Sequence, residues 1–253
     1  MLIDTHCHLD AAEFDVDRAE VHATALAAGV ERIVVPAVAV DGFAKTKATV
    51  ERYPGCLAAY GIHPMVVMQA RESDLAVLRD WLAREQPVAV GEIGLDHFVT
   101  DIDPVRQEFF FVEQLKLARE FDLPVLLHVR RAVDPILKQL RRIGVRGGIA
   151  HAFNGSRQQA EELIKLGFAL GFGGAMTFSG STRIRELAKN LPLDAIVLET
   201  DAPDIPPAWL NGGRNAPAEL ARIAEVLAEL RGIGRGEVML ATAATAQRVL
   251  PRL

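Results

Sequence analysis

Short apolar segments rich in valine and isoleucine alternate along the chain with longer segments in which apolar residues recur at helical spacing. Apolar runs this short have the length of buried strands, and the longer segments have the period of amphipathic helices. The predicted strands are Leu2 to Thr5, Arg32 to Pro36, Leu57 to Gly61, Val88 to Gly91, Val125 to His128, Gly148 to His151, Ala169 to Phe172 and Ala195 to Glu199.

Amphipathic helices are predicted between these strands. They include Asp17 to Ala28, Asp74 to Arg84, Pro104 to Phe121, Asp134 to Ile143, Arg157 to Leu166 and Arg183 to Leu191. Ser73 and Ser156 each precede a helix and are predicted N-caps. Two C-terminal helices, Pro217 to Arg231 and Glu237 to Arg248, are expected to complete the outer layer.

The strands are apolar almost throughout, which is typical of a parallel sheet covered by helices on its faces. Eight β/α units within 253 residues favour a single (β/α)8 TIM-like barrel with additional C-terminal helices, in which residues 1–253 form one domain. The alternative is an open doubly wound sheet. It is disfavoured because no glycine-rich phosphate fingerprint follows the first strand.

The charge and the cysteine content narrow the class of protein. A formal charge of -5 and a pI near 5.8 argue against a broad basic surface that binds nucleic acid. They are compatible with a local basic patch at the entrance to an active site. No apolar run reaches membrane-spanning length, and the N-terminus does not resemble a signal peptide, so we expect a cytoplasmic protein without membrane contact. Cys7 and Cys56 are expected to be reduced thiols.

Potential metal ligands follow the apolar segments where strands are expected to end. Histidines are scarce, with seven in the chain, yet four of them stand at such ends. The six candidate ligands are His6, His8, Glu92, His128, His151 and Asp201. The active sites of barrels form at the carboxyl ends of the strands, so we expect these six side chains to meet there.

Local spacing supports this metal site. His6 and His8 are two residues apart on the first strand, so both imidazoles face one side, while Cys7 faces a helix. Glu92 and Asp201 follow buried segments, where an ionised carboxylate is costly unless it is paired or bound to metal.

The donor set also indicates the type of metal. Four imidazoles and two carboxylates suit zinc, manganese, cobalt or nickel better than magnesium, although the sequence does not resolve the ion. Six ligands are too many for one open catalytic site. We therefore expect two divalent ions bridged by Glu92, with no organic cofactor.

Five further residues are candidates for supporting roles. His63 and Arg130 are candidate substrate-binding groups, with a structural role as the alternative for each. Asn154 could bind substrate or begin a turn. Glu199 is a candidate for orienting a histidine ligand from behind. Trp209, in a loop after the last strand, is a possible platform for stacking a base.

At these residues the chain resembles the TatD family of metal-dependent hydrolases, a branch of the amidohydrolase superfamily. The matching segments are Asp4-Thr-His-Cys-His-Leu-Asp10, Gly61-Ile-His-Pro64, Gly91-Glu-Ile-Gly-Leu-Asp96, Leu127-His-Val-Arg130, His151-Ala-Phe-Asn-Gly155 and Glu199-Thr-Asp-Ala-Pro203. They occur in the family's order across essentially the whole chain.

The resemblance implies a (β/α)8 barrel and metal-dependent nuclease activity, typically at DNA ends. It implies that one ion is held by His6, His8, Glu92 and Asp201, and the other by Glu92, His128 and His151. No lysine stands where many relatives in the superfamily carry a bridging carboxylated lysine. Four positions differ from the residues most common in the family, which puts the substrate preference in doubt. They are His97, Phe98, Ala152 and Asn154.

Three functions are open at this point. The leading hypothesis is a deoxyribonuclease that binds DNA transiently and cleaves phosphodiester bonds, end-wise, by a two-metal hydroxide mechanism in which Asp201 and Glu92 are catalytic. The second is an esterase, lactonase, amidase or aminoacyl-tRNA deacylase on the same site. The third is a non-catalytic metal-binding or partner-binding barrel. The sequence does not decide between DNA, RNA and small esters, the mode and direction of cleavage, or the oligomeric state.

Overall fold

A computed structural model describes all 253 residues, and one sheet of eight parallel strands forms its centre. The strands are β1 (Leu2–Asp4), β2 (Val30–Pro36), β3 (Cys56–Tyr60), β4 (Ala89–Asp96), β5 (Val125–Arg130), β6 (Gly148–Ala150), β7 (Phe168–Phe172) and β8 (Ile196–Leu198). They lie in chain order, and the backbone N–H of Thr5 donates to Leu198 O (3.1 Å) between the first and the last. The sheet therefore forms a nearly closed barrel. This confirms the predicted fold, and the doubly wound alternative is wrong.

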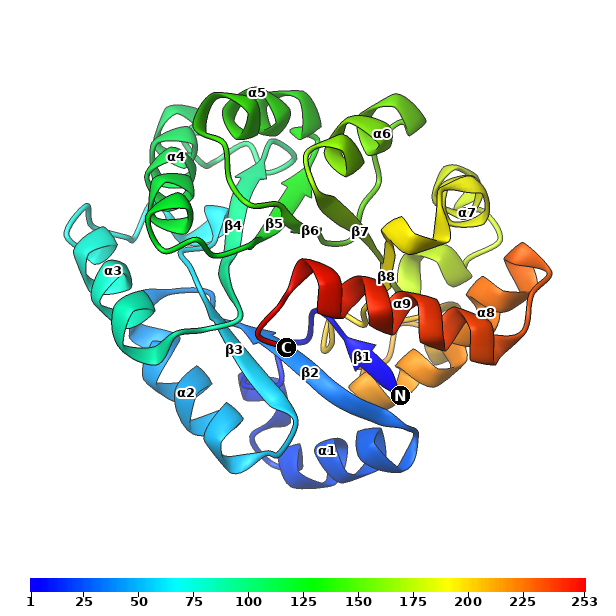
Figure 1. The fold of residues 1–253 in the computed structure, drawn as a ribbon. Coiled ribbons are helices and arrows are strands. Elements are labelled where there is room, and N and C mark those ends of the chain that lie inside the picture. The colour runs from blue at the N-terminus through cyan, green and yellow to red at the C-terminus, as the bar shows by residue number, and fades with distance from the viewer.

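The helices surround this sheet (Figure 1). They are α1 (Arg18–Ala27), α2 (Phe43–Arg52), α3 (Asp74–Glu85), α4 (Pro104–Glu120), α5 (Val133–Ile143), α6 (Arg157–Lys165), α7 (Thr182–Asn190), α8 (Leu220–Arg231) and α9 (Arg235–Val249). All the helices named from the sequence are present, and α2 is an additional one. None of the helices combines the length and the apolar character needed to cross a bilayer.

The two predicted N-caps differ. Ser156 Oγ accepts the backbone N–H of Gln159 (3.1 Å), and Gln159 Oε1 accepts the N–H of Ser156 (2.9 Å), which forms a capping box at the start of α6. Ser73 makes no such bond because its backbone is already helical, so its side chain does not reach back over the first turn.

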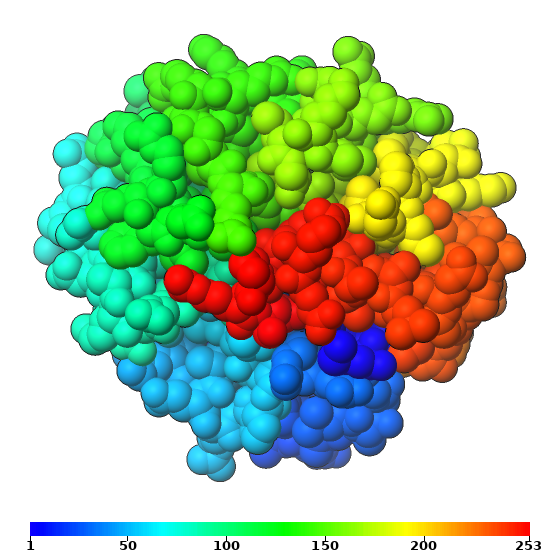
Figure 2. Space-filling model, in the orientation of Figure 1, coloured from blue at the N-terminus to red at the C-terminus, as the bar shows by residue number.

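The last helix does not lie where the sequence suggested. We expected both C-terminal helices in the outer layer, but α9 crosses the amino-terminal end of the barrel (Figure 1) and covers the middle of that face (Figure 2). Ala243, Ala246, Val249 and Leu250 pack there against inward-facing strand residues. The small alanines allow the helix to approach the strand ends closely, so this end of the barrel is sealed by apolar contacts.

Two central strands are longer than predicted, which changes where two candidate ligands lie. β4 continues to Asp96 and β5 to Arg130, so Glu92 and His128 stand inside strands rather than at their ends. The glycines of β4 make this pairing possible: a Cβ on Gly91 would lie 2.5 Å from Leu126 Cβ, and one on Gly94 would lie 2.0 Å from His128 O. Absence of side chains at these two positions lets β4 run close to β5.

Candidate metal centre

The first two histidines lie directly after β1, in a segment that breaks the alternation of the strand. Ile3 packs inside the amino-terminal half of the barrel, yet His6, three residues later, also faces the interior. The buried side chain of Asp4 fixes this turn, because its Oδ1 accepts the backbone N–H groups of His6 (3.3 Å) and Thr200 (2.9 Å). His6 and His8 thus reach one site, as predicted, while Cys7 packs in the surrounding hydrophobic core.

One oxygen of the buried Glu92 carboxylate faces the histidines that follow β1. His6 Nε2 lies 3.0 Å from Glu92 Oε2, and His8 Nε2 lies 3.7 Å from the same oxygen. Asp201 closes this group, with its Oδ1 3.6 Å from His6 Nε2 and 3.7 Å from His8 Nε2. Two imidazoles and two carboxylates therefore surround one small space.

The other oxygen of Glu92 faces a second set of histidines. His128 Nδ1 lies 2.8 Å, His151 Nε2 3.2 Å and His63 Nε2 3.4 Å from Glu92 Oε1. His63 also lies 3.1 Å from His128, between their Nε2 and Nδ1 atoms. Each oxygen of one carboxylate thus faces a different group of imidazoles, which is the arrangement that a bridging ligand requires.

Hydrogen bonds on the far sides of two rings fix which nitrogen faces the centre. His8 Nδ1 lies 3.2 Å from the carbonyl oxygen of Pro36, which can only accept, so Nδ1 carries the proton and Nε2 offers a lone pair. His128 Nε2 lies 3.0 Å from Asp96 Oδ2, which likewise directs the lone pair of Nδ1 toward Glu92. Sequence reasoning quoted Asp96 only as part of a motif and missed this contact.

The ionisation state of Asp96 suits it to accept this hydrogen bond. Burial by itself raises the pKa of its carboxyl group, but hydrogen bonds from His128 and from the backbone N–H groups of Phe98 and Val99 lower the pKa to about 2. The carboxylate is therefore ionised at neutral pH. Carboxylates in this position commonly orient a histidine that binds a metal.

Glu199 stands behind His151, at a longer distance than Asp96 from His128. His151 Nδ1 lies 3.5 Å from Glu199 Oε1, an oxygen that also accepts the backbone N–H of Ala152 (2.5 Å). The ring of His151 stacks on that of His6 with 3.9 Å between centroids. This close packing limits how far either imidazole can turn.

The titration of these groups reflects burial and mutual charge. Burial raises the pKa of Glu92, but the imidazoles around it lower the pKa well below its usual value. Burial raises the pKa of Asp201 to about 6 and lowers that of His6 to about 3. Burial lowers the pKa of His151, yet the charges of Glu92 and Asp201 raise it well above its usual value.

The donor set fits divalent metal ions. Three overlapping groups each bring their potential ligand atoms within 4.8 Å of one another, and these groups are His6, Glu92 and His151; His6, His8 and Asp201; and His63, Glu92 and His128. The Nε2 atoms of His6 and His151 face Glu92, and the buried Nδ1 atoms of both rings have no hydrogen-bond partner. Mixed imidazole and carboxylate donors suit borderline transition ions.

All of these side chains except the fully buried His6 line a cavity of about 620 Å³. Lys45, from α2, also lines the cavity and was missed by sequence reasoning; its Nζ lies 3.0 Å from Asp15 Oδ1. His63 lines it as well, whereas Asn154 does not, and its side chain accepts a hydrogen bond from Arg183 (3.0 Å).

Two other candidate substrate contacts lie outside this cavity. Arg130 is half-exposed, and its guanidinium packs over the ring of Phe98. Trp209 does not offer an open ring, because its Nε1 donates to Glu219 (2.7 Å) and the guanidinium of Arg222 covers it at 4.1 Å. The expectation of a stacking platform at Trp209 is therefore not supported.

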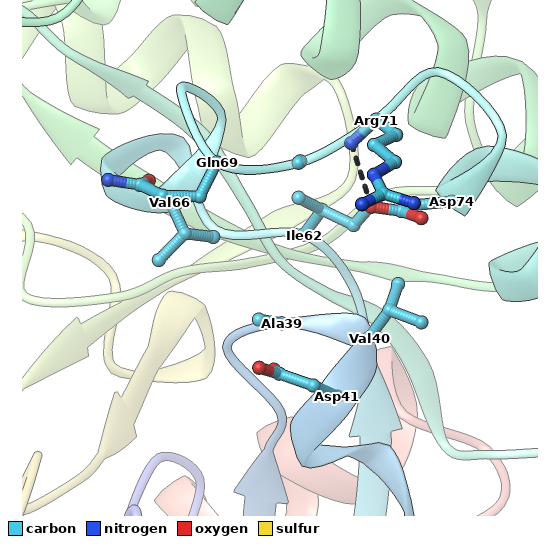
Figure 3. A pocket seen from close by; sticks show the side chains of 9 residues that line it. Ala39, Val40, Asp41, Ile62, Val66, Gln69, Arg71 and Asp74 are labelled. Atoms are coloured by element: carbon cyan, nitrogen blue, oxygen red, sulfur yellow. Dashed lines mark hydrogen bonds between the residues drawn. The ribbon is translucent and has the colours of Figure 1, made fainter.

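A second hollow of about 360 Å³ lies beside the cavity (Figure 3). Residues 39–41 line one side of it and residues 62–74 the other, and Ile62 contributes to a largely apolar wall. Ala39 and Asp41 line both hollows. No histidine lines the smaller one, so the candidate metal chemistry belongs to the larger cavity.

Comparisons with known proteins identify the family of the chain. The family model described as TatD related DNase matches residues 3–251. The chain is 43% identical to YjjV, an uncharacterized metal-dependent hydrolase of Escherichia coli, over 90% of each chain. The crystal structure of YjjV superposes with a TM-score of 0.95 at 40% identity, covering 99% of this chain and 98% of that one. A Cronobacter sakazakii protein named 3'-5' ssDNA/RNA exonuclease TatD is 34% identical over 98% of this chain and 97% of its own.

The match spans almost the whole chain, and the relatives are enzymes that depend on metal. The third hypothesis, a non-catalytic barrel, is therefore wrong. The chain belongs to the TatD family of metal-dependent hydrolases and is an enzyme that acts on ester bonds.

Proposed function

We propose that this hydrolase is a deoxyribonuclease that removes nucleotides from the ends of DNA strands with two divalent ions. The observation that supports this proposal most directly is the orientation of the Glu92 carboxylate, whose two oxygens face two separate groups of histidines. The relative named as a 3'-5' exonuclease and the DNase family description support phosphodiester bonds as the target.

The contacts suggest how the ligands divide. His6, His8 and Asp201 would hold one ion with Oε2 of Glu92, and His128 and His151 the other with Oε1. His63 is close enough to Glu92 to join the second group or to contact the substrate. Bound there, two ions would neutralise charge on a phosphodiester and lower the pKa of water.

The chain's own groups would supply the proton transfer and the positioning. Asp201 faces the cavity and would orient the attacking water or take its proton. Lys45 would offer a cation to a substrate phosphate within the same cavity. Asp96 and Glu199 would keep the rings of His128 and His151 in place.

One observation favours the second function, hydrolysis of a less charged ester. Besides Glu92 and Asp201, the cavity is lined by the carboxyl groups of Asp10, Glu13, Asp41 and Asp204, against one lysine. Carboxylates at the mouth repel a polyanion, which suits a carboxylic ester, lactone or aminoacyl ester better than a long nucleic acid.

A single assay separates the two functions. Metal-depleted protein would be given end-labelled single- and double-stranded DNA, RNA and a panel of carboxylic esters, with manganese, zinc, cobalt, nickel or magnesium restored in turn. We expect metal-dependent release of mononucleotides from DNA ends, which Glu92→Gln removes and the remote substitution Arg146→Ala retains. Intact DNA with every ion, together with turnover of an ester, would overturn the nuclease proposal.

A further inference from the structure

An exposed aromatic ring beside the metal centre carries two arginines. Phe98 follows β4 and is 45% exposed, and the guanidinium carbons of Arg130 and Arg131 lie 3.8 Å and 4.7 Å from its ring centroid. Guanidinium groups are held over aromatic rings by cation–π attraction and by stacking. This Phe98–Arg130–Arg131 cluster differs from Trp209, whose indole N–H is bonded to Glu219 within the chain.

The backbone is arranged so that both arginines reach the same ring. Consecutive residues of a strand point to opposite faces, so Arg130 and Arg131 would diverge if β5 continued. β5 ends at Arg130, and Arg131 has a left-handed φ of 54°. A residue other than glycine occupies this region at a cost of about 1 kcal/mol or more, and such strain gathers at functional positions.

The two guanidinium groups keep their hydrogen-bond donors free. Neither Arg130 nor Arg131 donates a side-chain hydrogen bond within the chain, and Arg130 only approaches Asp96, with 3.8 Å between Nη1 and Oδ2. Arg131 forms no ion pair. Each guanidinium has five N–H donors in a fork that matches a phosphate, so the cluster presents an open anion-binding surface.

Asp96 connects this surface to the metal centre. Its Oδ2 lies 3.0 Å from His128 Nε2, while its Oδ1 accepts the backbone N–H groups of Phe98 (2.9 Å) and Val99 (3.2 Å). One buried carboxylate therefore contacts both a candidate metal ligand and the backbone segment that carries Phe98.

The charge around the mouth is uneven. Four carboxylates and one cation, Lys45, lie on the side of the cavity formed after β1, β2 and β8, whereas the arginine cluster follows β4 and β5. The four carboxylates are those of Asp10, Glu13, Asp41 and Asp204, so the net charge of this side is negative. A polyanion is repelled on the first side and attracted on the second. A strand that enters the metal centre would therefore extend over β4 and β5.

We propose that the Phe98–Arg130–Arg131 cluster binds the single-stranded nucleic acid next to the bond that is cut. The guanidinium groups contact its backbone phosphates, and the ring of Phe98 holds both guanidinium groups at the surface. This inference rests on the proposed nuclease function, and it adds the path that the strand takes away from the metal centre.

The test compares a long substrate with a small one on the metal-loaded enzyme. Steady-state kinetics would be measured for an unpaired oligonucleotide of about 30 nucleotides and for bis(4-nitrophenyl) phosphate, with the variants Arg130→Ala/Arg131→Ala and Phe98→Leu. The matched control is Arg146→Ala, an exposed arginine at the opposite end of the barrel that pairs with Asp122. Phe98→Tyr keeps the ring and should restore the behaviour lost in Phe98→Leu.

For the double variant, KM for the oligonucleotide should rise about tenfold or more, since two charge-assisted contacts are lost. The ratio of kcat/KM for the oligonucleotide to that for the small diester should fall by the same factor. The slope of log kcat/KM against log salt concentration should decrease by about 1.4, or about 0.7 for each phosphate contact.

The outcomes separate the two proposals. If the wild-type enzyme degrades no oligonucleotide, the nuclease function is wrong and this inference is wrong with it. If the wild type degrades the oligonucleotide while the double variant retains its KM and salt slope, only the inference is overturned. An equal loss on both substrates would also overturn it, because the arginines would then act through His128 rather than on the strand.

Discussion

The two ends of the barrel contain the same eight strands but opposite kinds of side chain. At the amino-terminal end, inward-facing residues such as Ile3 and Val197 form a sealed apolar cluster with residues of α9. At the carboxyl end, histidines and carboxylates converge on Glu92 and line an open cavity. The barrel thus separates the residues that stabilise it from those that react.

This separation has an energetic reason. Burial of apolar surface contributes about 25 cal/mol for each Å² removed from water. Burial of an ionised carboxylate such as Glu92 is unfavourable unless other groups compensate it, and here imidazoles do so. The apolar end can therefore offset the cost of holding the polar end together, and bound metal would reduce that cost further.

The largest effect is expected at the polar end, from Glu92→Gln. The amide keeps the volume of the side chain but loses the charge shared by both groups of histidines. Several kcal/mol of charge stabilisation should be lost, which is on the order of a 10³-fold decrease in metal-dependent kcat. Phosphodiester turnover with saturating metal measures it, with Arg146→Ala as the control. A decrease smaller than tenfold would mean that Glu92 is not the shared ligand.

At the apolar end, Leu250→Ala should lower stability and leave turnover nearly unchanged. Leu250 is fully buried below the barrel, so truncation should reduce the free energy of unfolding by about 2–5 kcal/mol. Urea unfolding provides the measurement. Leu240→Ala, on the exposed side of α9, is the matched control and should change stability by about 0.5 kcal/mol or less. Equal effects of the two substitutions would contradict the sealing role of α9.

A smaller effect on activity is expected from Asp96→Asn. An amide has one acceptor oxygen, whereas Asp96 accepts with both, from His128 on one side and from Phe98 and Val99 on the other. We expect metal affinity or activity to fall about 10- to 100-fold. Calorimetric metal titration and kcat measure this loss. The exposed Asp122→Asn at the other end of the barrel should have no effect, and an unchanged metal Kd in Asp96→Asn would contradict the orienting role.

The smallest effect concerns pH. In the metal-free protein the pKa of Asp201 is raised to about 6, chiefly by burial, and hydrogen bonds to carboxylates raise the pKa of His128 against its burial. Below these values the groups hold protons that metal must displace. Metal affinity should therefore fall as pH falls through about 6, by about tenfold per pH unit for each displaced proton. Titrations in buffers of different ionisation enthalpy would count the protons, and a Kd that is constant across this range would contradict the prediction.

The fold could be predicted from the sequence because the pattern of a parallel barrel is local. Each strand is a short apolar run and each helix has its own period, so the order of elements suffices. The position of α9 could not be predicted in this way, because an alanine-rich helix fits the outer layer and the end of the barrel equally well. Only the packing of Ala243 and Ala246 against the strands distinguishes these two positions of the helix.

The candidate ligands could be named because polar residues that follow apolar runs stand out in the sequence. Asp96 was missed for a related reason: the predicted strand ended at Gly91, so Asp96 appeared to lie in a loop. Its importance depends on the extension of β4 beside β5, which the close approach at Gly94 permits. Lys45 comes from α2, a helix that the sequence reasoning did not name, and its neighbours on the cavity wall are distant in the chain.

The central claim is that the carboxyl end of the barrel is a metal centre organised by Glu92. Bound metal should be counted by elemental analysis after chelation and reloading, with phosphodiester turnover measured on the same samples of wild type and Glu92→Gln. We predict that turnover disappears on chelation, that it returns as about two ions bind per wild-type chain, and that the variant recovers neither. Full turnover in the chelated wild type, or in the reloaded variant, would contradict the claim.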